Sequence, residues 1–144
     1  MLKNLDPLLT PDLLQVLRAM GHGDEIVIVD ANYPAESAGP QVVRLDGIEA
    51  TRALDAVLSV MPLDEFVPDA CWRMEVVGAH EGEQPIFGEF RSIVAKREGP
   101  QFTLASLERF AFYARARECF AVVATGERRL YGNIILKKGI VRPE

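Results

Sequence analysis

The chain has 144 residues, the length of one ordinary domain, so we expect a single domain over residues 1–144. Hydrophobic residues make up 49% of the chain and charged residues 26%, a balance that fills a core and argues against intrinsic disorder. The net charge of −5 argues against a nucleic-acid partner, because phosphate binding needs concentrated positive charge.

Charge is uneven along the chain: residues 1–100 carry a net −9 and residues 101–144 a net +4. We interpret this as acidic and basic faces that offset each other within or between subunits. The apolar runs are strand-sized, which predicts no membrane span, and the first residues lack the pattern of a secretory signal, so we expect a cytoplasmic protein. Cys71 and Cys119 are too few for a disulfide framework and are expected to be reduced, partly buried thiols.

The first predicted helix begins after Thr10, which can cap it, and Pro11 occupies the tolerated first position. Its apolar residues fall on one face at helical spacing, and Gly21 ends it. The next element is the run Glu25-Ile-Val-Ile-Val, which leads into Asp30. An unbroken β-branched run of this kind is typical of a strand buried on both faces, as in a parallel sheet.

The remaining elements alternate between strand and helix. After a loop rich in Pro and Gly over 31–40, the pattern predicts strands over 41–45, 72–77, 102–107, 120–124 and 133–136, and helices over 49–61, 86–97 and 108–117. This order predicts an α/β fold: one layered domain with a mostly parallel central sheet flanked by helices.

His22 is the first candidate for chemistry. It lies between Gly21 and Gly23, which leave its imidazole little crowded, on a turn that joins a helix to a buried strand. Such a histidine can act as a general acid or base near neutral pH, although a plain surface histidine would look the same. The Gly-x-Gly is not a dinucleotide fingerprint, because the third glycine is missing and the motif precedes the strand.

Three further segments carry groups that can hold a small polar ligand. Asp30 falls at the carboxyl end of a predicted inner strand, the edge where open α/β sheets bind ligands. Arg109 begins a helix directly after a strand, and its guanidinium can donate several hydrogen bonds. Tyr131-Gly132-Asn133 offers neutral donors and acceptors before the last strand. Each segment also has a plain structural interpretation. Taken singly, Asp30 fits an aspartate that starts a turn, Arg109 fits a solvated arginine, and residues 131–133 fit an ordinary turn.

Several other chemistries find no support in the sequence. The two histidines, His22 and His80, stand in no His-Glu-x-x-His or Cys-x-x-Cys arrangement, so we expect no metal site. The chain has neither a phosphate-binding Gly-x-x-x-x-Gly-Lys loop nor a Gly-x-Ser-x-Gly nucleophile elbow.

The order and spacing of six segments resemble the family of the L-fucose mutarotases and the related D-ribose pyranases, the fucose branch most. The segments are Met-Gly-His-Gly-Asp-Glu-Ile (20–26), Asp-Ala-Asn-Tyr-Pro-Ala (30–35), Gly-Pro-Gln-Val-Val-Arg (39–44), Arg-Phe-Ala-Phe-Tyr (109–113), Thr-Gly-Glu-Arg (125–128) and Tyr-Gly-Asn-Ile-Ile-Leu-Lys-Lys-Gly (131–139). The resemblance covers nearly the whole chain and is weakest over residues 61–100.

The resemblance implies an isomerase that interconverts the α and β anomers of L-fucose, or of a related pyranose, by acid–base catalysed ring opening and closure. It implies His22 as the catalytic histidine, Asp30 and Arg109 as sugar ligands, and Tyr131, Gly132 and Asn133 as the segment that completes the pocket. Tyr131 or a bound water is our expectation for the second proton-transfer group. The reaction needs no cofactor.

The same resemblance implies a ring-shaped homo-oligomer, commonly a decamer, with pockets near the subunit interfaces. Two alternative functions stay open on the sequence alone. One is interconversion of the pyranose and furanose forms of D-ribose, and the other is a non-catalytic sugar-binding accessory role.

Overall fold

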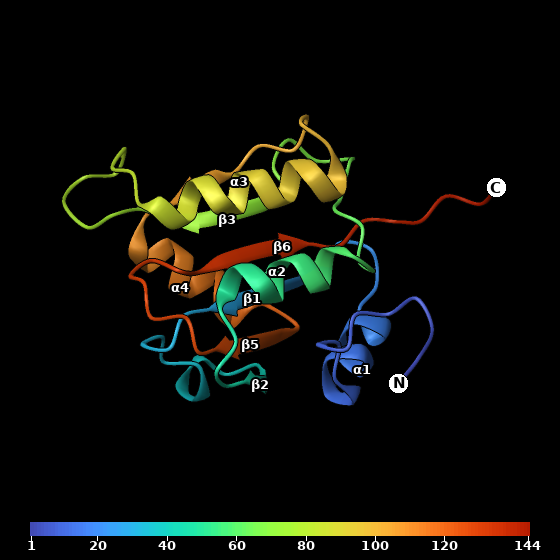
Figure 1. Cartoon of the computed structure of the whole chain (residues 1–144). Helices are drawn as coiled ribbons and strands as arrows, with labels where there is room; N and C mark the ends of the chain where they lie inside the picture. Colours follow the sequence, from blue (N-terminus) through green and yellow to red (C-terminus); the bar gives the residue numbers. More distant parts are fainter.

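The computed structural model describes residues 1–144 and contains one six-stranded sheet with helices on both faces (Figure 1). The strands are β1 (Glu25–Val29), β2 (Gln41–Leu45), β3 (Cys71–Met74), β4 (Ala105–Leu107), β5 (Ala121–Thr125) and β6 (Ile134–Lys137). The helices are α1 (Pro11–Ala19), α2 (Ala50–Leu58), α3 (Pro85–Glu98) and α4 (Arg109–Arg117), with a 3₁₀ turn η1 (Glu36–Ala38).

The strand order β2-β5-β1-β6-β3-β4 decides which loops meet. β1 and β2 both pair with β5 in parallel, and β3 pairs with β4 in parallel. β6 is antiparallel to both of its neighbours, β1 and β3. The carboxyl ends of the other five strands and the amino end of β6 therefore lie at one edge of the sheet, called the carboxyl edge below. The predicted α/β fold with a mostly parallel sheet is confirmed.

The central strand β1 separates two apolar layers. Ile26 and Ile28 face the larger core, which includes residues of α1, α2 and α3, while Val27 and Val29 face a smaller core around Phe112 of α4. All four of these strand residues are completely buried. The uninterrupted β-branched run thus reflects a strand covered on both faces, as predicted. In Figure 1, α2 and α3 lie side by side over the sheet.

Polar caps fix the ends of two helices that lead into the functional loops. Thr10 Oγ1 accepts a hydrogen bond from the Leu13 N–H at the start of α1, and the Lys138 ammonium donates to the Leu17 and Met20 carbonyls at its other end. Glu108 caps α4 by accepting from the N–H groups of Phe110 and Ala111. These caps hold the turn before β1 and the first residues of α4 in place.

Two strands are shorter than predicted. β3 ends at Met74 instead of residue 77, and β4 begins at Ala105 instead of residue 102. The ladder ends because the chain turns back on itself, with Val76 bridged to Ala79. The Val77 N–H is taken by the Tyr131 hydroxyl at 3.0 Å instead of by a strand partner. No helix has the length and apolar character needed to cross a bilayer.

Candidate functional site

Five of the six predicted site residues lie at the carboxyl edge. Asp30 directly follows β1, Tyr131, Gly132 and Asn133 directly precede β6, and Arg109 opens α4 after β4. Because β6 runs against its neighbours, its amino end meets the carboxyl end of β1. Asp30 therefore lies at the carboxyl edge of the sheet, as predicted, and four other candidate residues share that edge.

Asp30 and Asn133 are joined directly across the β1–β6 pair. The Asp30 N–H donates to Asn133 Oδ1 at 2.9 Å, and Asp30 Oδ1 accepts from the Asn32 N–H at 3.0 Å. Asp30 is 7% exposed. Burial raises the pKa of this carboxyl above its ordinary value, and the hydrogen bond from Asn32 partly opposes the shift. The pair is thus a pre-positioned, largely desolvated polar group at the edge of the sheet.

Gly132 has a packing reason to be glycine. A Cβ at this position would come within 2.7 Å of Glu127 Cγ and 3.3 Å of Asp30 Cβ, so a larger residue would displace the Glu127 side chain and crowd Asp30. The preceding residue, Tyr131, adopts a left-handed backbone conformation with φ of 62°, which is uncommon outside glycine. Its hydroxyl accepts a hydrogen bond from Val77, so the phenol links the β6 entry to the loop after β3.

Arg109 lies in a cavity of about 440 Å³ at the outer part of the carboxyl edge. The cavity lining also includes Glu75, His80, Glu108 and Phe110. The guanidinium carbon of Arg109 lies 4.7 Å from the centroid of the exposed Phe110 ring, a cation–π contact that leaves the N–H groups available.

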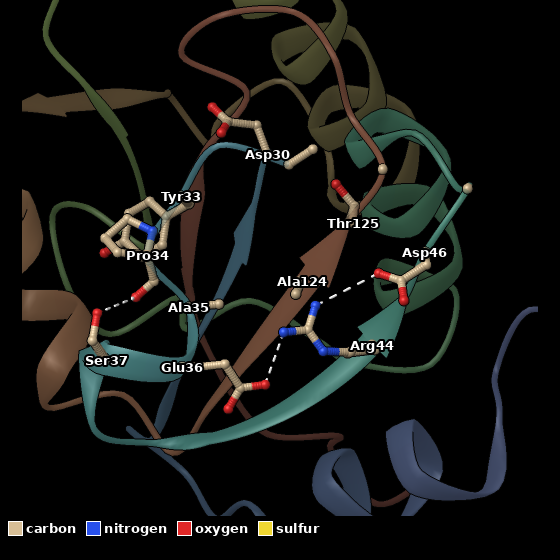
Figure 2. Close-up of a pocket in the computed structure, with 13 residues that line it drawn as sticks. Asp30, Tyr33, Pro34, Ala35, Glu36, Ser37, Arg44, Asp46, Ala124 and Thr125 are labelled. Atoms are coloured by element: carbon tan, nitrogen blue, oxygen red, sulfur yellow. Dashed lines mark hydrogen bonds and ion pairs between the residues drawn. The ribbon is translucent and has the colours of Figure 1, made fainter.

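A second cavity, of about 410 Å³, opens beside Asp30 over the ends of β5 and β2 (Figure 2). Figure 2 shows the Arg44 side chain between Glu36 and Asp46. Asp30 lies at the rim of this cavity, and its carboxylate points away from the cavity. Arg44 is 2.8 Å from Glu36 and 3.6 Å from Asp46. Both cavities fall within the range of roughly 300–1,000 Å³ typical of small-molecule sites.

The strand order fixes the relation between the two cavities. One lies over β2, β5 and β1, the other over β3 and β4, and β6 separates them. The segment 131–133 therefore stands between a buried acidic residue on one side and an arginine on the other. Such an edge can hold a ligand that has several hydroxyl groups, because it combines acceptors, charged donors and neutral groups.

His22 is not part of this edge. It lies on the turn before β1, at the opposite end of the sheet, and its side chain is 46% exposed. The five strand residues of β1 separate the turn that holds His22 from Asp30, and at about 3.3 Å per residue they span roughly 17 Å. A single chain therefore brings Asp30, Arg109, Tyr131, Gly132 and Asn133 to one edge and leaves His22 at the other.

The surroundings of His22 hold a group that the sequence analysis missed. The Nε2 atom of His22 is 3.1 Å from Oδ1 of Asp64, which is 2% exposed, and its ring is 5.6 Å from that of Phe66. Asp64 lies 42 residues from His22, and no local pattern marks it as a partner. Only the path of the loop after α2 in the folded chain brings Asp64 to His22.

Glu127 stabilises the loops at the carboxyl edge through hydrogen bonds. Its backbone carbonyl accepts from the Ala31 N–H, and its buried carboxylate accepts from the Arg129 guanidinium and the Ala50 N–H. The hydrogen bonds from the Arg129 side chain, foremost, hold the pKa of Glu127 below its ordinary value. Glu127 thereby ties the loop after β1 to the start of α2.

We expect Glu127→Gln to lower the free energy of unfolding by roughly 1.5–3 kcal/mol, because it weakens hydrogen bonds to a buried charge. The difference from the parent chain should shrink as the pH falls below the ordinary range of a glutamate, where the parent also loses this charge. Denaturant unfolding at pH 7 and at about pH 3, below the ordinary range of a glutamate, measures both values. Glu89→Gln, which removes the exposed partner of Arg129, is the matched control and should cost less than about 1 kcal/mol.

Comparison with known proteins identifies the family to which the chain belongs. Residues 3–141 match the model of the RbsD / FucU transport protein family. The fucose mutarotase of Homo sapiens is 47% identical over 146 residues, which cover 97% of this chain and 94% of that protein.

Solved structures give the same result. The fucose mutarotase from Streptococcus pneumoniae, in complex with L-fucose, superposes with a TM-score of 0.90 at 43% identity, over 98% of this chain and 100% of that one. RbsD from Bacillus subtilis, complexed with D-ribose, superposes with a TM-score of 0.77 at 22% identity, over 99% and 100%, and shares the fold. On the family match and the full-length relatives, this chain belongs to the RbsD/FucU family.

Proposed function

We propose that this protein is an isomerase that interconverts the α and β anomers of L-fucose, or of a closely related pyranose. The observation that carries the proposal is the identity of 47% with a fucose mutarotase over nearly the full length of both chains. A structural relative of 43% identity holds L-fucose, and the carboxyl edge of this chain has the hydroxyl-binding groups such a ligand needs. We propose one domain, residues 1–144, as the catalytic unit.

The reaction requires little more than positioned proton carriers. A proton is placed on the ring oxygen while the anomeric hydroxyl loses one, the ring opens to the aldehyde, and the ring closes again on the other carbonyl face. Positioned acid–base groups contribute roughly 10²–10⁴-fold to such a step. We assign His22 to one proton transfer and Tyr131, or a water, to the other. Asp30, Arg109 and Asn133 hold the hydroxyls and fix the orientation of the sugar.

This assignment requires a second copy of the chain, because His22 and Asp30 lie at opposite ends of one sheet. We propose that the His22 end of one copy meets the carboxyl edge of another. Such a head-to-tail contact, repeated with closure, produces a ring, and the resemblance to the family favours a decamer.

Exposed apolar side chains at both ends support this contact. Phe66 and Val141 are exposed in the segments beside the His22 turn, and Val77, Phe110 and Leu130 are exposed around the carboxyl edge. Large apolar side chains grouped at an edge indicate a protein contact. Sedimentation velocity tests the oligomer: a monomer at micromolar concentration would contradict the ring.

The direct test is NMR exchange between the anomers of L-fucose at equilibrium. Saturating one anomeric proton should reduce the signal of the other only when the protein is present. Transfer with D-ribose and not with L-fucose would favour interconversion of the ribose forms instead. Saturable binding without faster exchange of either sugar would favour an accessory role. The cytoplasmic location stays a prediction, which imaging of a tagged chain would test.

Arg109→Leu should raise the KM for fucose about 10- to 100-fold, the loss expected for a hydrogen bond from a charged donor. The same exchange experiment at several sugar concentrations measures it. The matched control is Arg52→Leu, which removes an exposed arginine of α2 that pairs with Asp6. If both variants kept the parent KM, Arg109 would not be a sugar ligand.

A further inference from the structure

We propose that Lys138 is a positioning residue for His22: it holds the short turn over residues 20–24 in the one shape that presents the imidazole for proton transfer. The inference rests on the proposed function, because it concerns the same reaction. Lys138 directly follows β6 and contacts this turn twice, with its side chain at the start of the turn and with its backbone at the end.

The His22 turn has little stiffness of its own, because a glycine stands on each side of the histidine. Gly23 adopts a left-handed backbone conformation with φ of 88°. Glycine loses more conformational freedom on folding than any other residue, so a turn with two glycines depends on contacts from outside. Without such contacts, we expect the imidazole to sample several positions.

The side chain of Lys138 fixes the start of the turn. Its ammonium donates to the Leu17 carbonyl at 2.7 Å and to the Met20 carbonyl at 2.6 Å. Both carbonyls lie at the end of α1, where a helix leaves its last carbonyls without partners of its own. The Gly21 N–H, in the same peptide unit as the Met20 carbonyl, donates to the Asp24 carboxylate at 2.7 Å. This peptide unit is therefore held at both its oxygen and its hydrogen.

The backbone of Lys138 fixes the end of the turn. Its N–H donates to the Asp24 carbonyl at 2.8 Å, and its carbonyl accepts from the Gly23 N–H at 2.8 Å. A change of side chain at position 138 leaves these two backbone hydrogen bonds in place. Such a variant therefore loosens the start of the turn and retains its end.

The charge of the ammonium strengthens the hold. Hydrogen bonds from an ionised donor are roughly twice as strong as those between neutral groups. Burial, and then the nearby Arg18 guanidinium, lower the pKa of Lys138, whereas Asp24 raises it. The two carbonyls at the end of α1 thus replace water that the partly buried ammonium has lost.

Lys138→Met should lower kcat for anomer exchange about 10- to 100-fold with KM nearly unchanged. A small displacement of the imidazole slows proton transfer, whereas the proposed sugar ligands lie at the other edge of the sheet. Arg18→Met is the matched control, because it removes an exposed cation from the last turn of α1 and leaves both carbonyl contacts intact. This control should keep the parental kcat. Lys138→Arg should restore part of the rate, because a guanidinium can also donate to two carbonyls.

Hydrogen–deuterium exchange gives a readout that needs no sugar. Mass spectrometry of a peptide that contains residues 20–24 should show faster exchange in Lys138→Met than in the parent or in Arg18→Met. Peptides from β1 and β6 should exchange as in the parent. Unchanged exchange of the turn in a folded Lys138→Met protein would overturn the proposal.

A merely structural role would give a different result. It would lower the free energy of unfolding but leave the kcat of the folded, assembled protein at the parental value, and that result would also overturn the proposal. Circular dichroism and sedimentation establish folding and assembly. If Lys138→Met did not assemble, Lys138→Gln would carry the same test, because its shorter, neutral side chain also removes the charged donor.

The outcomes separate this inference from the function. If the parent protein exchanged no sugar, the proposed function would fail, while hydrogen–deuterium exchange would still test whether Lys138 holds the turn. If the parent were active and His22→Ala inactive, parental kcat in a folded, assembled Lys138→Met would overturn the role of Lys138 alone.

Discussion

Replacing His22 by alanine is expected to remove most of the acceleration of fucose anomer exchange, a loss of roughly 10²–10⁴-fold in kcat. The imidazole is half-exposed on a turn, and its removal leaves the two apolar cores untouched. Because the buried Asp64 carboxylate loses one hydrogen-bond partner, the free energy of unfolding should fall by about 1 kcal/mol, with the fold retained. Saturation-transfer NMR measures the rate, and denaturant unfolding measures the stability.

The other histidine, His80, provides an alternative proton carrier against which the assignment of His22 is tested. His80 lines the Arg109 cavity, on the same edge as Asp30 and Asn133. A folded His22→Ala protein with parental exchange would contradict the assignment. If His80→Ala instead lost the activity, the proton carrier would lie at the carboxyl edge, and one chain would hold a whole site.

Two inactive variants should restore activity to each other when they assemble together. His22→Ala lacks the proposed proton carrier, and Asp30→Asn lacks a proposed sugar ligand at the opposite end of β1. In a mixed ring, some contacts join the intact His22 end of one copy to the intact carboxyl edge of the next. With random head-to-tail mixing of equal amounts, about one quarter of the contacts are intact, so about one quarter of the parental rate should return.

Co-expression with two different affinity tags, followed by purification through both, supplies the mixed assemblies. Each single variant purified alone gives the baseline exchange rate. The His22→Ala, Asp30→Asn double variant, assembled alone, gives the lowest rate expected. No recovery in a mixed assembly of parental size would mean that the two residues do not act at a shared contact. Recovery would place one residue on each side of the interface.

The element pattern was largely predictable from the sequence, and the physical reason is local. Thr10 and Pro11 set the start of α1, and the β-branched run after Asp24 predicted β1, because capping and burial leave signals within a few residues. The ends of β3 and β4 were not predictable. Beyond the end of β3, the Val77 N–H donates to the Tyr131 hydroxyl, which lies 54 residues away in the sequence, and no local pattern encodes this contact.

The candidate residues show the same division. Asp30 was predicted at a ligand-binding edge from its place after β1, and the structure puts it there because strand ends follow from the chain order. Its hydrogen bond to Asn133, 103 residues away, required the antiparallel placement of β6, which no local pattern encodes.

By itself, then, the sequence determined the fold class, the chemical types of the candidate residues and the family they resemble, because these depend on residue identity and short spacing. Only the tertiary structure decided which of those residues meet. It put His22 at one end of β1 and the proposed sugar-binding groups at the other, and it placed Asp64 against His22. The reason is that a strand has two ends: residues close in sequence on either side of it are held apart, while distant loops meet at each edge.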